Sequence, residues 1–291
     1  MRFLIIIPAH NEEDSILLCL NSLAEQTYQN FNCIIVNDGS TDKTKELVEN
    51  FIKKNTSFRL KNLDTSFHQP GAKVVQTFYQ GLEEVSLADF DVICKFDADV
   101  IFPPQYLENI NKIYTENPKA GMVSGLVYIQ NDKGEWIYEN LSSKNHVRGP
   151  IKSYRKDCFF AMNGLRPVLG WDNIDVMLTQ MNGYEIVTVK NIWVKHLRPT
   201  AYKYKSQKAE KLGEYFYNIG LNLPLAMISS AKSSFKNRSF SEFFITMKSF
   251  LSQNKPLQLT QEEIKFIRNL RNPLQKVLNK QLNLLLNNIW N

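Results

Sequence analysis

Two aspartates separated by one residue, Asp97 and Asp99, follow an apolar run at 92–96 and precede a Pro-Pro turn. The run is typical of a buried strand, so both carboxylates are expected at its carboxyl end. In open α/β sheets, this end faces the crevice where ligands bind. Carboxylates there could hold Mg²⁺ or Mn²⁺ and leave coordination positions for phosphate oxygens. A second Asp-x-Asp, Asp89 and Asp91, comes before the strand and is interpreted as a solvated turn.

Polar groups follow other predicted strands in the same way. Asp38 could accept hydrogen bonds from a base N–H or a ribose hydroxyl, and Lys73, entering a predicted helix, could neutralise a phosphate. Each also has a plain structural interpretation, as a helix cap and as a solvated charge. The sequence contains neither Gly-x-Gly-x-x-Gly nor Gly-x₄-Gly-Lys-Ser/Thr, so a Rossmann dinucleotide site and a P-loop are disfavoured.

The elements that must position these groups alternate between strand and helix. Apolar runs predict strands at 3–7, 33–36, 58–63 and 92–96. Helical spacing of apolar residues predicts helices near 16–23, 47–51 and 72–85. This alternation predicts a mostly parallel sheet flanked by helices. Further strands are expected at 121–129 and 186–189, with loops between them, and residues beyond about 205 show only helical patterns.

Charge divides the chain unevenly. Residues 1–189 carry 18 Lys and Arg against 24 Asp and Glu, a net −6, whereas residues 190–291 carry a net +12. Such a basic segment indicates an anionic partner, either a membrane surface or nucleic acid, or else a solubilising helical surface. The four cysteines have no paired spacing, which favours a reducing compartment over a disulfide framework or a zinc site. No apolar window approaches the roughly 18 residues of a membrane-spanning helix.

The basic segment over 205–291 is predicted to form amphipathic helices. Thr260 and Glu263 match a capping box, after which apolar residues continue at helical spacing to Leu285. Pro273 should kink or divide that helix. The segment could lie on an anionic membrane, with Phe240 among its apolar contacts, or pack on the catalytic body or a second subunit.

Three ordered motifs resemble the signature of family 2 glycosyltransferases with the GT-A fold. They are IIPAHNE at 6–12, VNDGSTD at 36–42 and FDAD at 96–99, and the resemblance covers roughly residues 1–200. The resemblance implies an α/β GT-A domain over 1–204, with a mostly parallel central sheet and a helical extension over 205–291. It also implies a UDP- or GDP-sugar donor, Mg²⁺ or Mn²⁺, and transfer with inversion at the anomeric carbon.

The resemblance also implies roles for individual residues on the donor side. Asp38 would contact the base or ribose, Asp97 the ribose or donor sugar, and Asp99 the metal. His196 takes the place of a late histidine near the metal or diphosphate, where Arg198 could help with phosphate. The remaining predicted nucleotide-sugar contacts are Pro8, Ala9, His10, Glu12 and Lys73.

On the acceptor side, the family places a carboxylate base in a Gly-Trp segment, which GWDNID at 170–175 matches. The family often has Glu-Asp where this chain has Ile174 and Asp175, so the first acidic member is absent. Asp175 is the predicted base, and Asp172, three residues earlier, is the alternative. Predicted acceptor contacts are Trp171, which could instead be a packing residue, and Tyr154 and Arg155, which could instead contact the diphosphate or belong to an ordinary β-segment with solvated charges.

These features predict a metal-dependent hexosyltransferase acting on a glycan or lipid-linked acceptor in cell-surface polysaccharide biosynthesis. The enzyme is expected in the cytoplasm, peripheral on the inner face of the cell membrane. A nucleotidyltransferase is one alternative, although the Gly-rich triphosphate loop that it normally carries is absent. A non-catalytic nucleic-acid-binding protein using the basic segment is the other, but it leaves the acidic motifs unexplained. Nucleic acid is therefore not an expected partner.

Overall fold

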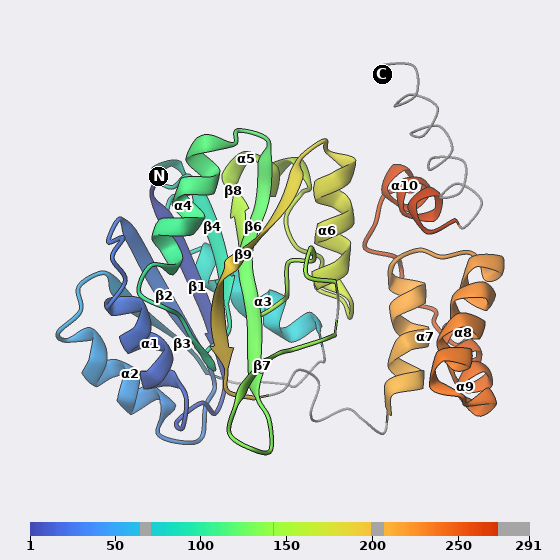
Figure 1. Ribbon diagram of the computed structural model, residues 1–291, viewed down its shortest axis with the longest axis horizontal. Coiled ribbons are helices and arrows are strands. Elements are labelled where there is room, and N and C mark those ends of the chain that lie inside the picture. The colour runs from blue at the N-terminus through green and yellow to red at the C-terminus, as the bar shows by residue number, and fades with distance from the viewer. Residues whose placement is uncertain (65–70, 142, 199–206, 273–291) are drawn as a thin grey trace. The chain divides into compact units, whose positions relative to one another are not determined.

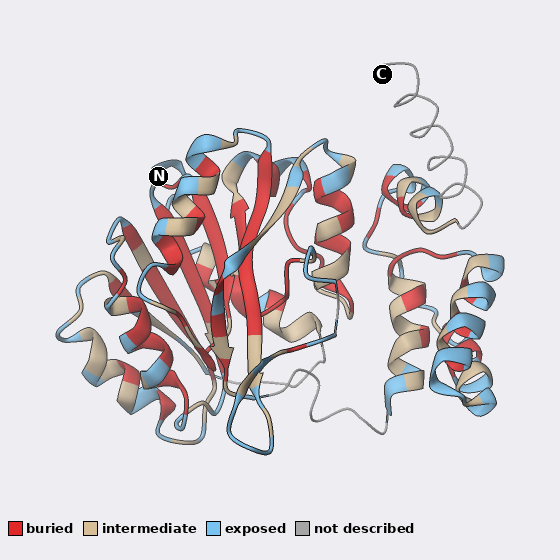
Figure 2. Ribbon diagram, viewed as in Figure 1, coloured by how far each residue is buried: buried red, intermediate tan, exposed pale blue. Residues whose placement is uncertain are grey.

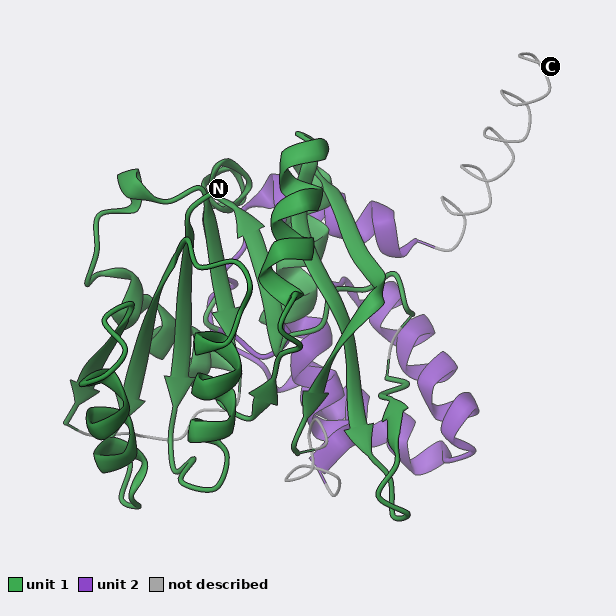
Figure 3. Cartoon of the chain, turned by 60° about the vertical axis from the view of Figure 1, so that its left-hand side comes forward, with its two compact units in different colours: residues 1–167, 171–202 green, residues 168–170, 203–291 purple. Residues whose placement is uncertain are grey.

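The computed structural model describes residues 1–64, 71–141, 143–198 and 207–272 (Figure 1). Contacts divide the chain into two compact units (Figure 3). The first contains residues 1–167 and 171–202, and the second contains 168–170 and 203–291. The predicted domain boundary between residues 204 and 205 falls outside the described residues.

Four parallel strands form one half of a nine-stranded sheet in the first unit. β1 (Phe3–Ala9) lies between β2 (Phe31–Asp38) and β4 (Val92–Phe96), and β3 (Phe58–Leu63) pairs with β2. The apolar runs of β1, β2 and β4 are buried on both faces, as parallel strands between helical layers require (Figure 2). All four strand predictions are confirmed.

The other half of the sheet is mainly antiparallel. β8 (Ile151–Arg155) runs antiparallel to β4 and to β6 (Ala120–Gln130). β9 (Glu185–His196) is parallel to β6, β5 (Val100–Ile101) pairs antiparallel with β9, and β7 (Trp136–Tyr138) pairs antiparallel with β6. The strand order is β3-β2-β1-β4-β8-β6-β9-β5, so the sheet is mixed and its parallel part is confined mostly to the first half.

The loops predicted between 130 and 185 are one clear error. This stretch contains β7, β8, α5 (Lys156–Ala161) and α6 (Trp171–Met181). β8 escapes sequence reasoning because Lys152 and Ser153 interrupt its apolar pattern, although both are buried in the sheet. The interpretation of Asp89 and Asp91 is confirmed, since both are exposed, at and just after the end of a short 3₁₀ helix (Leu87–Asp89).

Helices cover both faces of the sheet. α1 (Ile16–Ala24), α2 (Thr44–Ile52) and α4 (Tyr106–Glu116) share one core cluster with Phe3, Ile5 and Ile7 of β1. α3 (Ala72–Leu82) packs against β1 and β2 from the other face. A Cβ at Gly81 of α3 would lie 2.7 Å from Ile6 and 2.8 Å from Val36, so glycine permits this close approach.

The second unit is helical among its described residues. It contains α7 (Lys208–Asn218), α8 (Leu223–Asn237), α9 (Phe240–Leu251) and α10 (Gln261–Arg271). The capping box predicted from Thr260 and Glu263 is present at the start of α10. Pro273 and the apolar positions up to Leu285 lie outside the described residues. Within the part of the chain that is described, no helix has the length and apolarity needed to span a bilayer.

Candidate active site

The ends of β1 and β2 bring several predicted nucleotide-binding residues together. Pro8 and Ala9 end β1, and the Nδ1 atom of His10 lies 2.7 Å from the carbonyl oxygen of Asp38. The Asp38 side chain is buried, lies 3.1 Å from the Lys73 ammonium and accepts a hydrogen bond from Thr77 at 3.2 Å. Lys73 therefore neutralises Asp38 from the first turn of α3.

Arg198 links two carboxylates that come from different strand ends. Its Nη2 donates to both oxygens of Glu12, and its Nε donates to Asp99 Oδ2 at 2.9 Å. Ser15 also donates to Glu12, at 2.7 Å. Burial raises the pKa of Glu12, and the hydrogen bonds from Arg198 and Ser15 offset part of that effect. The guanidinium thus balances negative charge that would otherwise accumulate at this edge of the sheet.

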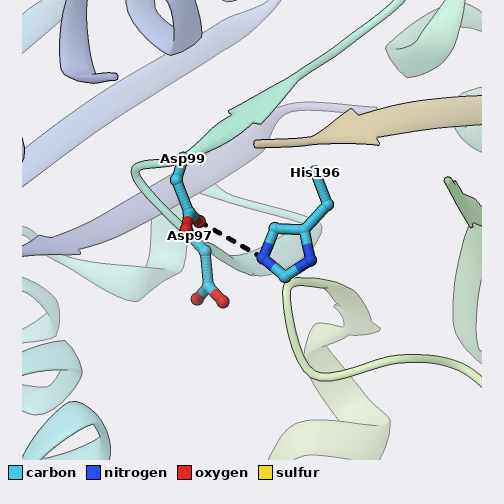
Figure 4. A group of neighbouring side chains, drawn as sticks. All are labelled: Asp97, Asp99 and His196. Atoms are coloured by element: carbon cyan, nitrogen blue, oxygen red, sulfur yellow. Dashed lines mark ion pairs between the residues drawn. The ribbon is translucent and has the colours of Figure 1, made fainter. Parts of the chain in front are cut away.

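Asp97, Asp99 and His196 form a group that could hold a metal ion (Figure 4). One ligand atom from each lies within 4.8 Å of the others. Val100 pairs with His196 between β5 and β9, and this register places His196 Nε2 3.4 Å from Asp99 Oδ1. Two carboxylates and one imidazole suit Mn²⁺, and the carboxylates also suit Mg²⁺. The residues present therefore fit a divalent cation.

Burial and neighbouring charges shift the pKa values of Asp99 and His196 in opposite directions. Burial tends to raise the pKa of Asp99, but the hydrogen bond and charge of His196, together with Arg198, hold it below its usual range. Burial tends to lower the pKa of His196, but the carboxylates of Asp99, 3.4 Å from Nε2, and Glu139, 3.8 Å from Nδ1, raise it to about 9. In the metal-free protein, His196 is therefore a cation at neutral pH, and a bound metal ion would replace its proton.

A buried lysine fixes Asp97. Lys95 of β4 forms an ion pair with the Asp97 carboxylate, and its Nζ lies 5.0 Å from the centre of the Trp171 ring. Lys152, its register partner on β8, lies 5.4 Å from the same ring. Trp171 is 6% exposed and packs against these cations, which favours its interpretation as a packing residue over that as an acceptor contact.

Asp175 is enclosed by donors. Lys152 Nζ lies 2.6 and 2.7 Å from its two carboxylate oxygens, and Tyr154 donates to Oδ2 at 2.6 Å. The residue is 1% exposed, and burial raises the pKa of its carboxyl. A carboxylate held in this way has no free face for an acceptor hydroxyl, so the structure does not support the prediction of Asp175 as the base.

Asp172, the alternative base, is only partly buried in the first turn of α6. Its main-chain carbonyl accepts a hydrogen bond from Lys152 at 2.5 Å, which fixes the backbone while leaving the carboxylate to other partners. Asp172 lies near Gly149, since a Cβ atom added to this glycine would be 3.6 Å from Asp172 Oδ2. The Gly149 carbonyl accepts a hydrogen bond at 3.4 Å from Lys95, the same lysine that pairs with Asp97.

The acceptor contacts predicted for Tyr154 and Arg155 are wrong. Tyr154 is fully buried against Asp175. Arg155 pairs with Val92, at the opposite end of β4 from Asp97. Its guanidinium donates to three main-chain carbonyls, including that of Tyr114 at 2.6 Å, and so joins β8 to the α4–β6 turn.

Sequence reasoning missed a carboxylate behind the metal-binding group. Glu139 is 3% exposed, forms an ion pair with buried Arg148 at 2.8 Å, and lies 3.8 Å from His196 Nδ1. A single acidic residue after a three-residue strand has no distinguishing pattern in the sequence. Lys95 was also missed, although a charge inside the apolar run VICKF was a usable signal.

Residues 4–168 match the model of the family described as Glycosyl transferase family 2. The chain belongs to glycosyltransferase family 2. Membership favours sugar transfer over both alternatives, the nucleotidyltransferase and the nucleic-acid-binding protein.

Curated proteins are similar in sequence to part of this chain. Over 126 residues, the chain is 27% identical to poly-beta-1,6-N-acetyl-D-glucosamine synthase of Staphylococcus epidermidis, and the match covers 43% of this chain and 28% of that protein. Over 99 residues, the chain is 38% identical to teichoic acid poly(glycerol phosphate) polymerase of the same species, and this match covers 34% of this chain and 13% of that protein. The chain thus spans less than a third of these relatives' lengths.

Solved structures show the same fold. A mannosyltransferase from Pyrobaculum calidifontis, in complex with GDP-Man and Mn²⁺, aligns with a TM-score of 0.60 and 16% identity, covering 88% of this chain and 76% of that one. S. aureus TarS 1-349 in complex with UDP aligns with a TM-score of 0.56 and 15% identity, and the alignment covers 90% of this chain and 95% of that one. The predicted GT-A fold with a helical C-terminal region is confirmed.

Asp175→Asn is expected to destabilise the glycosyltransferase because it leaves the Lys152 ammonium buried without a counter-charge. Breaking a buried pair in this way costs about 3–5 kcal/mol. Urea unfolding measures the free energy, and Asp132→Asn, at an exposed turn position, is the control that should change it by under about 0.5 kcal/mol. Equal stability of both variants would show that Asp175 does not balance Lys152.

Proposed function

We propose that this glycosyltransferase moves a sugar from a UDP- or GDP-sugar to a hydroxyl of a glycan or lipid-linked acceptor, with inversion and with Mg²⁺ or Mn²⁺. The observation that carries the proposal is the convergence of Asp97, Asp99 and His196 beside the ends of β1 and β2. A nucleoside diphosphate lying along this edge would meet the acidic and basic groups that such a ligand needs. The enzyme would then be of the hexosyltransferase type.

Donor binding would use the residues at the ends of β1 and β2. Asp38, buried beside Lys73 and Thr77, would accept hydrogen bonds from the base or ribose. Pro8, Ala9, His10 and Glu12 would line the same pocket. The donor class is supported by structures of the same fold solved with GDP-Man, UDP and UDP-GlcNAc.

Asp99 and His196 would hold the cation, with Asp97 turned toward the same point (Figure 4). When bound, such a cation stabilises the charge that grows on the leaving nucleoside diphosphate. Arg198 already lies against Asp99 and would add a second positive charge beside the diphosphate. Asp97, fixed by Lys95, would face the ribose or the donor sugar.

We propose Asp172 as the general base. The acceptor oxygen attacks C1 of the sugar, the bond from C1 to the diphosphate oxygen breaks on the opposite face, and the hydroxyl proton passes to Asp172. General-base catalysis of this kind contributes about 10²–10⁴ in rate. Lys152 acts as a positioning residue because it holds the Asp172 carbonyl and the Asp175 carboxylate with one ammonium.

The second unit is proposed to lie on an anionic membrane. α8 and α9 expose Phe235, Phe240 and Phe244 at 88%, 89% and 70%. These two helices and their junction carry four cations, Lys232, Lys236, Arg238 and Lys248, against one acidic residue, Glu242. Aromatic side chains bordered by cations are typical of helices that lie in the membrane interface, and each cation contributes about 1 kcal/mol there. Attachment to the cytoplasmic face would suit a lipid-linked acceptor.

Asp172→Asn is expected to reduce kcat by about 10²–10⁴ with donor binding unchanged, because the amide cannot take the acceptor proton. Asp99→Asn should instead weaken metal-dependent donor binding. Nucleoside diphosphate release and calorimetric donor titration with Mn²⁺ separate the two effects, with Asp132→Asn as the control. Full transfer by Asp172→Asn would exclude it as the base, and full transfer by both variants would contradict the proposed function.

Glu139→Gln is expected to weaken Mn²⁺ binding by about 10–100-fold, the usual cost of losing a carboxylate that orients a ligating histidine. Glu135→Gln is the control, since Glu135 is exposed just before β7. Titration of free Mn²⁺ followed by electron paramagnetic resonance gives both dissociation constants without any reaction. Identical constants would show that Glu139 does not orient His196.

The triple variant Phe235→Ser, Phe240→Ser and Phe244→Ser is expected to lose at least tenfold in affinity for phosphatidylglycerol-containing vesicles, because three exposed aromatic rings are removed. Cosedimentation of the full chain measures this affinity. The matched control replaces the exposed Leu18, Ile137 and Leu141 of the first unit by Ser. Unchanged vesicle binding, or conversion of a dimer to a monomer by the triple variant, would contradict the membrane proposal.

A further inference from the structure

A groove of about 710 Å³ follows the edge of the sheet beside β9 in the first unit. One side is formed by Asn191, Trp193 and Lys195 of β9, and the other by Ile101 of β5, the Pro103–Pro104 turn and the start of α4. β5 pairs with only the last two residues of β9, so the edge of β9 before them is not covered by β5. None of these lining residues is part of the proposed donor site.

Trp193 is the main feature of this groove. Its side chain remains 37% exposed although its ring lies on that of Tyr128, with centroids 4.6 Å apart and an interplanar angle of 34°. Tyr138 of β7 contacts Tyr128 edge-on at 6.1 Å. The strand registers place Trp193, Tyr128 and Tyr138 on one face of the sheet, so the exposed indole is held by packing rather than free to rotate.

Polar groups also line the groove, mostly from the α4 side of the sheet, because Ile192 and Val194, which alternate with Trp193 on β9, belong to the core cluster shared with α4. Asn109, Gln105 and Asn191 line the groove with side-chain amides that can donate to and accept from hydroxyl groups. Lys195 lies over the Trp136 ring at 5.4 Å. A few polar groups around an apolar wall are typical of small-ligand sites, in which the apolar part supplies affinity and the polar part supplies orientation.

The lining matches the chemistry of a saccharide. One face of a pyranose ring presents C–H groups whose slightly positive hydrogens fit the negative face of an indole, and its rim presents hydroxyls. The groove shares two strands with the proposed metal site, since Ile101 belongs to β5 and Lys195 to β9, although Lys195 and His196 point to opposite faces of β9. We propose that this groove binds sugar units of the acceptor chain that lie away from the reacting end. This inference rests on the proposed function, because it assumes a glycan acceptor.

The test measures binding of β-1,6-linked N-acetylglucosamine oligomers of two to six units to the full chain, without donor or metal. Affinity should rise with oligomer length and fall at least tenfold in Trp193→Ala, whereas Trp193→Phe should retain most of it because a ring remains. Ile137→Ala, an exposed apolar position on β7, is the matched control. Thermal unfolding verifies that all three variants are folded.

Binding that does not depend on length, or that is equal in Trp193→Ala and the control, would overturn the proposal. So would a shift from dimer to monomer in Trp193→Ala by light scattering, since the groove would then join two copies of the chain. Because no donor is present, failure of this binding leaves transfer by the wild type intact. If the proposed function were wrong, the wild type would show no sugar transfer, although oligomer binding would still depend on length and on Trp193.

Discussion

The pairing of β5 with β9 is the constraint on which the candidate site depends. β5 has two residues, and its register with β9 sets Val100 opposite His196. This pairing brings Asp99 close to His196 and to Arg198, which lies 99 residues away in the sequence. Two residue pairs therefore bring the segment after β4 directly against the end of β9, in addition to the connection of the two strands through β8 and β6.

Charge compensation explains how so many carboxylates can share one edge of the sheet. Lys73 lies against Asp38, Lys95 against Asp97, Lys152 against Asp175, and Arg198 against Glu12 and Asp99. A buried charge without a partner costs several kcal/mol, so the ion pairs of Lys95 and Lys152, whose side chains are buried, are needed for the fold. Lys95 and Lys152 face each other across β4 and β8 with Trp171 beside both, which couples the donor side of the site to α6.

Much of the fold could be predicted because its signals are local. Continuous apolar runs identified the parallel strands, and the helical spacing on α1 and α3 identified the covering layers. β8 was missed because the burial of Lys152 depends on Asp175, a partner that adjacent sequence does not reveal. For the same reason, the motif could not choose between Asp172 and Asp175 as candidate bases: they have the same chemistry, and only burial distinguishes them. Arg155 was misplaced because an antiparallel strand carries its last residue away from the site.

The bridge from Arg198 to Glu12 and Asp99 has a consequence for how ligands would enter. The guanidinium donates to Asp99 Oδ2, whereas Asp99 Oδ1 faces His196. A divalent ion held by Asp99 and His196 would therefore share the Asp99 carboxylate with Arg198 and would weaken the hold of that carboxylate on the guanidinium. Arg198, whose side chain is half-exposed, would then be freer to turn toward the phosphates of a donor.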